Sequence, residues 1–200
     1  MNDSRSGADA RLAFFREFLR HPDEVGSVVP SSRFLERRLV DIAAIAKARL
    51  VVELGPGTGG TTAAILRAMS SDGRLLAVEI NSQFVARLRA VGDPRLMVHA
   101  GNAVDLGDAL ACRGLSDPDV VLSGIPFSTM SAALGRRILL GAWRALAPGG
   151  RFVAYQFRGS VGILGGDILG APEVAVEMRN APPVRIYCWR KPGRGAPTAI

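Results

Sequence analysis

Three glycines at alternate positions mark the part of the chain best suited to bind a ligand. Gly55, Gly57 and Gly59 directly follow the apolar run "RLVVEL" and directly precede the helix-like stretch "TTAAILRAM". Glycine permits a tight turn, lets a ligand approach the backbone, and allows the following helix to pack near the strand. A strand, a glycine-rich turn and a helix in this order are typical of the first turn of a nucleotide-binding sheet.

Two glutamates narrow the class of ligand. Glu53 stands just before the glycines, and Glu79 closes the next apolar run, "LLAVEI", 22 residues after Gly57. A carboxylate at the end of the second strand can accept hydrogen bonds from both ribose hydroxyls of an adenosine ligand. Glu53 would repel a pyrophosphate, so it suits a ligand that carries an ammonium group. The two acids therefore predict an adenosine ligand with a positive charge rather than a dinucleotide.

A parallel sheet would bring these residues together, because its strands end at the same edge. The chain beyond residue 50 has the alternation of strands and helices that such a sheet requires. Apolar runs at 49–54, 75–80, 95–100, 120–125 and 151–157 alternate with helix-like stretches, which predicts βαβ crossovers and a parallel sheet. Two strand-like runs around Pro182 and Pro183 predict an antiparallel pair that closes the sheet. We predict an α/β, three-layer, Rossmann-like fold in a single domain, with helices at 1–49, a cofactor-binding core at 50–157 and a sheet-closing, substrate-binding segment at 158–200.

Composition places the chain among globular proteins with an anionic partner. Hydrophobic residues make up 48% and charged residues 22%, which argues against a disordered chain. The net charge of +7 is concentrated at the two ends, and this suits nucleic acid, an anionic membrane surface or an ordinary solvated surface. The two cysteines form no metal-binding motif, and no signal peptide or apolar run of roughly 20 residues is visible. We expect a cytoplasmic protein without a metal, soluble or peripherally bound to the inner face of the membrane.

The motifs together resemble those of the class I S-adenosylmethionine-dependent methyltransferases. "VVELGPGTGG" resembles their first motif and "LLAVEI", which ends in Glu79 and Ile80, their second. "HAGNAVDL" resembles the next motif, which implies that Asn102 and the backbone of Ala103 meet the adenine edge; the family usually has Asp in place of this Asn. The resemblance spans about residues 50–157 and implies S-adenosylmethionine as cofactor.

The acceptor corner of this superfamily follows the fourth strand, and here it reads Ser123-Gly124-Ile125-Pro126-Phe127. The resemblance implies that backbone carbonyls of this segment orient the acceptor amine, that Ser123 also contacts the cofactor, and that Phe127 borders the product cation. The rRNA adenine dimethylases have a similar "IPF", but Ser123-Gly124 replaces their Asn. Their separate helical C-terminal domain has no counterpart before residue 200. No side chain stands out as a general base.

A second family, the bacterial phospholipid N-methyltransferases, resembles the chain over about residues 12–191. The matching segments are "VGSVVPSSRFL", "ELGPGTG", "SGIP" and the segment Asn180–Tyr187. The resemblance implies stepwise methylation of phosphatidylethanolamine toward phosphatidylcholine, and a related branch acts on ornithine lipids. A nucleic-acid adenine methyltransferase, a soluble small-amine methyltransferase and a non-enzymatic adenosyl-binding module remain alternatives.

Two further groups of residues suit a lipid substrate. Arg185 and Tyr187 lie on one face of a predicted strand, where they can meet a lipid phosphate or headgroup. The stretch "RLAFFREFLR" predicts an amphipathic helix, which either lies in an anionic membrane interface or packs over the sheet. Its apolar side would carry Phe14, Phe15 and Phe18, and its polar side Arg16 and Arg20.

Overall fold

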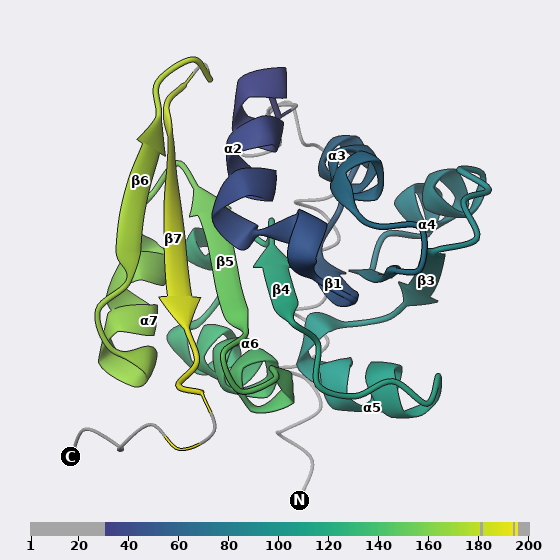
Figure 1. Cartoon of the computed structure of the whole chain (residues 1–200). Coiled ribbons are helices and arrows are strands. Elements are labelled where there is room, and N and C mark those ends of the chain that lie inside the picture. Colours follow the sequence, from purple (N-terminus) through teal and green to yellow (C-terminus); the bar gives the residue numbers. More distant parts are fainter. Residues whose placement is uncertain (1–30, 181, 194, 196–200) are drawn as a thin grey trace, which may run out of the picture.

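A seven-stranded mixed sheet forms the centre of the molecule, in the order β3-β2-β1-β4-β5-β7-β6 (Figure 1). The computed structural model describes residues 31–180, 182–193 and 195. β1 to β5 are parallel, whereas β7 runs antiparallel to both β5 and β6, as the sequence predicted. The strands are β1 (Leu50–Leu54), β2 (Arg74–Glu79), β3 (Leu96–Ala100), β4 (Val120–Ser123), β5 (Arg151–Gln156), β6 (Glu173–Glu177) and β7 (Val184–Arg190).

Helices cover both faces of this sheet and complete the predicted three layers. α2 and α3 pack on one face, and α5, α6 and α7 pack on the other. Within the described ranges, no helix is long and apolar enough to cross a membrane. The helices are α2 (Arg33–Ala43), α3 (Gly60–Ala68), α4 (Ser82–Arg89), α5 (Leu106–Ala111), α6 (Ala132–Ala145) and α7 (Ser160–Leu169), with 3-10 turns at Ile45–Lys47, Ala103–Asp105 and Phe127–Thr129.

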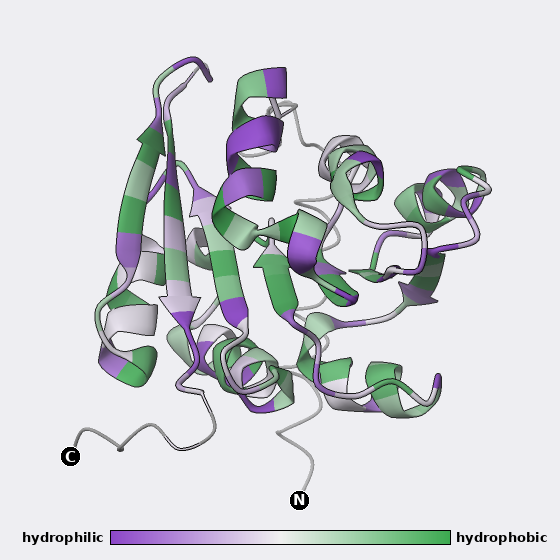
Figure 2. Ribbon diagram, viewed as in Figure 1, coloured by the Kyte–Doolittle hydropathy of each residue, from purple (hydrophilic) through white to green (hydrophobic). Residues whose placement is uncertain are grey.

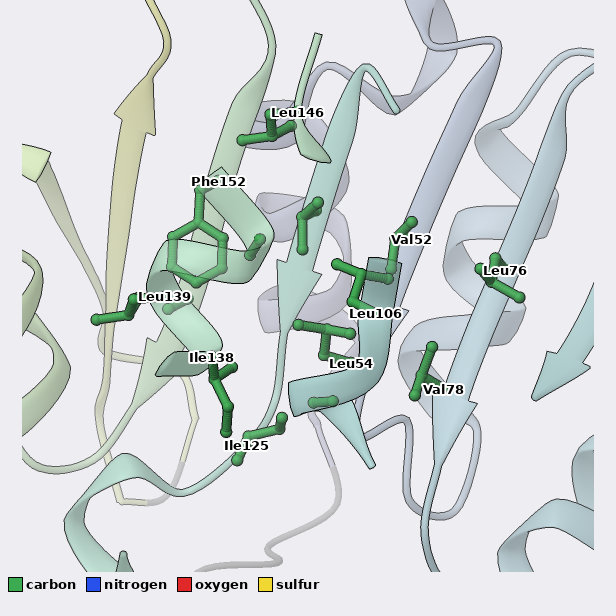
Figure 3. Packing of buried hydrophobic residues seen from close by; sticks show 14 of the residues in the cluster. Val52, Leu54, Leu76, Val78, Leu106, Ile125, Ile138, Leu139, Leu146 and Phe152 are labelled. Atoms are coloured by element: carbon green, nitrogen blue, oxygen red, sulfur yellow. The ribbon is translucent and has the colours of Figure 1, made fainter. Parts of the chain in front are cut away.

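The inner strands are mostly apolar because helices bury them on both sides. Every residue of β1 is buried, and the inner strands are mainly hydrophobic in Figure 2. Val52 and Leu54 face α5 and α6, as Figure 3 shows, while Val51 faces α2 and α3. This double burial fixes the register of the strands and so the height at which each strand ends.

Helix α7 was not among the predicted helices, because its sequence "SVGILGGDIL" is rich in glycine, a weak helix former. Its glycines serve close packing instead. A Cβ at Gly162 would lie 2.4 Å from the Tyr187 ring, and one at Gly165 would lie 2.4 Å from the Trp189 ring. Packing against the aromatic side chains of β7 therefore stabilises a helix that local propensity does not predict.

Asn180 connects the two ends of the described chain. Its side-chain oxygen accepts a hydrogen bond of 3.0 Å from the backbone N–H of Ser32, and its amide nitrogen donates one of 3.1 Å to the carbonyl of Pro182. Only 2% of Asn180 is exposed. Ser32 in turn caps α2 by accepting a hydrogen bond from the N–H of Leu35. The hairpin between β6 and β7 is thereby fixed to the start of α2.

We expect Asn180→Ala to lower the free energy of unfolding by about 1–3 kcal/mol, because it removes two hydrogen bonds of a buried side chain, each contributing about 0.5–1.5 kcal/mol. Urea denaturation followed by circular dichroism measures the change. Gln83→Ala, at an exposed position of α4, is the matched control and should change stability by less than about 0.5 kcal/mol. Equal stability of the two variants would contradict a structural function of Asn180.

Candidate active site

The glycine-rich turn leaves β1 and enters α3 with an unusual backbone. Gly55, Gly57 and Gly59 have φ angles of +69°, +56° and +89°, in the left-handed region that favours glycine. A Cβ built on Gly57 would meet no atom within 4 Å. The backbone of Gly57 is therefore open to a ligand from that side, as the sequence predicted for this glycine.

Glu79, at the end of β2, fixes the shape of this turn. Its carboxylate accepts hydrogen bonds from the backbone N–H of Gly57, at 3.1 Å, and from that of Asn81, at 2.8 Å. Burial raises the pKa of Glu79, and the N–H groups of Asn81, Gly57 and Ile80 oppose that rise. A carboxylate has about four lone-pair sites, so Glu79 keeps hydrogen-bonding capacity for a ribose.

Glu53, in β1, is a buried acid with unused hydrogen-bonding capacity. One carboxylate oxygen accepts a hydrogen bond of 2.6 Å from the hydroxyl of Thr62, and the other has no partner among the described residues. Burial raises the pKa of Glu53 to about 7; the Thr62 hydrogen bond lowers it and the charge of Glu79 raises it further. A buried, unpartnered carboxylate oxygen beside a nucleotide-binding turn fits a cationic ligand group.

The third predicted cofactor contact lies at the end of β3. Asn102 follows this strand and caps a 3-10 turn by accepting a hydrogen bond of 3.1 Å from the N–H of Val104, and Ala103 is buried in that turn. Because β3, β2 and β1 are neighbours, their carboxyl ends bring Asn102, Ile80 and the glycine turn to one edge of the sheet.

The acceptor corner begins where β4 ends, beside β1 in the sheet. The hydroxyl of Ser123 is buried and accepts a hydrogen bond of 3.4 Å from the N–H of Ile125. The carbonyl of Ile125 accepts a hydrogen bond from the side chain of Gln156, and the carbonyl of Pro126 accepts two from Thr129. Phe127 is 4% exposed and packs in the hydrophobic core. The corner is thus a buried, hydrogen-bonded loop at the switch point of the sheet.

The end of β5 adds two polar residues that the sequence analysis did not assign. A Cβ built on Gly124 would lie 2.7 Å from the hydroxyl of Tyr155 and 3.0 Å from the carbonyl of Gly55. Tyr155 therefore reaches the junction of the cofactor turn and the acceptor corner, and Gln156 holds that corner from the opposite face of the sheet. The signal was a Tyr-Gln pair at the end of an otherwise apolar strand.

The structure describes only some of the residues that were predicted to contact lipid. Arg185 is exposed on β7 and donates a hydrogen bond of 3.4 Å to the carbonyl of Phe157. Tyr187 is buried in the core beneath α7. Residues 31–180, 182–193 and 195 contain no group of three metal-binding side chains. The predicted apolar and basic residues of the N-terminal helix lie outside the described residues: Phe14, Phe15, Phe18, Arg16 and Arg20.

Comparison with curated proteins finds methyltransferases. The chain is 33% identical over 141 residues to an ornithine lipid N-methyltransferase from Singulisphaera acidiphila, which covers 70% of this chain and 73% of that protein. It is 31% identical over 111 residues to a ribosomal RNA small subunit methyltransferase A from Burkholderia, covering 51% of this chain and 40% of that protein. The search of family models found no match.

Solved structures share the fold at low identity. The N-methyltransferase NodS from Bradyrhizobium japonicum, in complex with S-adenosyl-L-homocysteine, aligns with a TM-score of 0.66 and 15% identity over 91% of this chain and 98% of that chain. A 1,6-didemethyltoxoflavin-N1-methyltransferase from Burkholderia thailandensis, also with bound S-adenosylhomocysteine, aligns with a TM-score of 0.69 and 16% identity over 96% and 92% of the two chains.

The fold agrees with these comparisons. The curated relative that is 33% identical matches more than two thirds of its length, which is enough to assign the family. The chain therefore belongs to the class I S-adenosylmethionine-dependent methyltransferases, in the same family as the ornithine lipid N-methyltransferase, and is an N-methyltransferase that uses S-adenosylmethionine.

Proposed function

We propose that the protein methylates the primary amine of a membrane lipid, with phosphatidylethanolamine as the first acceptor and phosphatidylcholine as the end product. The match to a lipid N-methyltransferase over most of its length is the observation that carries this proposal. That relative acts on ornithine lipid, so the same observation makes ornithine lipid the second candidate acceptor.

The contact between Asn180 and Ser32 supports a lipid substrate. These residues belong to the two segments in which the chain resembles the phospholipid N-methyltransferases and which generic methyltransferases lack. The side chain of Asn180 holds the N–H of Ser32 at 3.0 Å, so the two segments form one structural unit. Because Ser32 caps α2, this unit also includes the start of that helix.

The space beside Gly124 argues against adenine methylation. The adenine dimethylases have Asn in the place of Ser123-Gly124, but a Cβ at 124 would meet the hydroxyl of Tyr155 at 2.7 Å. Real Cβ atoms almost never approach another heavy atom this closely. An adenine-type Asn at 124 would therefore need Tyr155 to move, and this favours a different set of contacts to the acceptor amine.

An exposed apolar surface near the tip of the β6–β7 hairpin supports membrane contact. Val174 and Val176 project from one face of the edge strand β6, and Met178, at the turn, is 70% exposed. Arg185 lies opposite Val176 on β7. Apolar side chains beside a basic one suit an anionic lipid surface, since the first enter the interface and the second meets the headgroups. Peripheral binding to the inner membrane face is part of the proposal.

The reaction needs positioning more than acid–base chemistry. S-adenosylmethionine supplies the electrophilic methyl group on its sulfonium. With that cofactor bound, Glu53 would hold the ammonium of its methionine portion, directly or through water, and Glu79 would hold the ribose. The loop from Ser123 to Phe127 places the acceptor amine, as free base, in line with the methyl group, and most of the rate acceleration comes from this orientation and from exclusion of water.

With radiolabelled S-adenosylmethionine and vesicles of phosphatidylethanolamine plus an anionic lipid, we expect label in mono- and dimethylated phosphatidylethanolamine. Parallel vesicles carrying ornithine lipid separate the two candidate acceptors, and soluble ethanolamine and rRNA test the other classes. Thin-layer chromatography of the extracted lipids reads the product. Label in RNA or in ethanolamine, with none in either lipid, would overturn the proposal.

Glu79→Gln should weaken S-adenosylhomocysteine binding roughly ten- to a hundredfold. Hydrogen bonds to a charged group contribute about 1.5–3 kcal/mol, and an amide offers only one accepting oxygen to the turn and to the ribose. Isothermal titration calorimetry measures the dissociation constant. Glu173→Gln, an exposed change of the same charge on β6, should leave it unchanged. Equal affinity of both variants would place the ribose elsewhere.

Glu53 should make the stability of the unliganded protein depend on pH. Its pKa of about 7 in the folded state exceeds the usual 4.5, so the folded state binds the proton more tightly. Stability is therefore lost as the pH rises from about 4.5 to 7, by about 2 kcal/mol between pH 5 and pH 8. Glu53→Gln should be relatively more stable than the wild type at pH 8 than at pH 5. A stability difference that does not change with pH would contradict the raised pKa.

A further inference from the structure

The hydroxyl of Tyr155 lies in the space that a side chain at residue 124, in the acceptor corner, would occupy. The Cβ that Gly124 lacks would lie 2.7 Å from the hydroxyl oxygen of Tyr155 and 3.1 Å from its ring carbon Cζ. The same point is 3.0 Å from the carbonyl of Gly55 in the cofactor turn. Tyr155 belongs to β5, whereas Gly124 and Gly55 directly follow β4 and β1. Each of the three is partly exposed, although the strands are almost entirely buried. The hydroxyl thus lies where the acceptor and the cofactor must meet.

The hydroxyl is oriented by its neighbours. It lies 3.3 Å from the hydroxyl of Thr61, a side chain of the first turn of α3 that is 3% exposed. Burial and the nearby charge of Glu53 raise the pKa of Tyr155 to about 12, against the hydrogen bonds with Thr61 and Ser31. The phenol therefore stays neutral at any pH at which the enzyme works. It can donate its proton to Thr61 and keep its oxygen lone pairs available as acceptors.

The attacking amine requires hydrogen-bond acceptors, and the oxygen of Tyr155 can serve as one. As a free base, a primary amine directs its lone pair at the methyl group and has two N–H groups that require acceptors in a site closed to water. Two carbonyls of the acceptor corner already accept hydrogen bonds from protein groups, that of Ile125 from Gln156 and that of Pro126 from Thr129. Gly124 offers no side chain.

We propose that the hydroxyl of Tyr155 accepts a hydrogen bond from the acceptor amine and so aims its lone pair at the methyl group, in place of a side chain at residue 124. The inference rests on the proposed lipid-amine function. The nitrogen lone pair forms the new C–N bond while the S–CH₃ bond breaks and leaves its electron pair on sulfur. The methylated ammonium then loses a proton to solvent before the next transfer, and Tyr155 exchanges no proton at any step.

The proposal can be tested because the acceptor amine has a different number of N–H groups at each methyl transfer. The free base of a primary amine has two, that of a monomethylated amine has one, and that of a dimethylated amine has none. Tyr155→Phe should slow the first and second transfers by roughly ten- to a hundredfold and leave the third nearly unchanged. This is the effect of one lost hydrogen bond from a nitrogen that gains positive charge in the transition state. Single-turnover rates on vesicles of phosphatidylethanolamine and of its mono- and dimethylated forms measure the three steps.

Ile186→Val is the matched control. Ile186 pairs directly with Tyr155 on the neighbouring strand and packs in the same cluster, so the variant loosens the same face of the sheet without touching the hydroxyl. It should slow all three transfers equally or not at all. In Tyr155→Phe, the dissociation constant of S-adenosylhomocysteine should stay within about twofold, because the hydroxyl serves the acceptor and not the cofactor.

Three results would overturn this inference. Unchanged single-turnover rates of Tyr155→Phe at the first and second transfers would show that the hydroxyl does not orient the amine. An equal loss at all three steps, or a large loss of cofactor affinity, would assign Tyr155 a purely structural function. Wild-type enzyme that labels neither candidate lipid would overturn the proposed function, and this inference with it, whereas the first two results leave the proposed function standing.

Discussion

Two buried carboxylates at the ends of adjacent parallel strands constrain this structure most strongly. Glu53 and Glu79 lie at most 3% exposed, where a charge is costly unless hydrogen bonds or a cation compensate it. Glu79 is compensated by the backbone of the glycine turn, which only residues tolerant of positive φ can form. Glu53 is compensated by Thr62 alone on one oxygen. The glycine turn stabilises Glu79, and Thr62 at the start of α3 stabilises Glu53, so both local structures compensate these acids.

Much of the cofactor side of the site was predictable because its signals are local. Gly55, Gly57 and Gly59 are adjacent to the strand and the helix that they join, so the order of elements and the positive φ angles follow from a few residues. The fold class followed from the alternation of apolar runs, and the antiparallel closure followed from the composition of the tail. Parallel strands that are buried on both faces are runs of apolar residues, and such runs can be recognised in the sequence alone.

The acceptor side was less predictable because its contacts join distant parts of the chain. Arg185 and Tyr187 do share a face, as alternation requires, but α7 covers Tyr187 and leaves Arg185 exposed. The covering helix escaped prediction because Gly162 and Gly165 lower helix propensity while they permit the close approach to the aromatic side chains of β7. Propensity is a local quantity, and here a tertiary contact outweighs it.

Gly124 and Tyr155 illustrate the same limit at the reactive centre. Residue 124 follows β4 and residue 155 belongs to β5, yet one small volume beside the carbonyl of Gly55 can hold a side chain from only one of them. A side chain at 124 would require the Tyr155 hydroxyl, 2.7 Å from the Cβ position, to move. In the sequence, the acceptor corner after β4 therefore lacks a polar side chain at residue 124. In the structure, Tyr155 of the neighbouring strand β5 places a hydroxyl there. Because the two side chains differ in reach and shape, this exchange is a physical means by which one fold can present its methyl group to amines of different geometry.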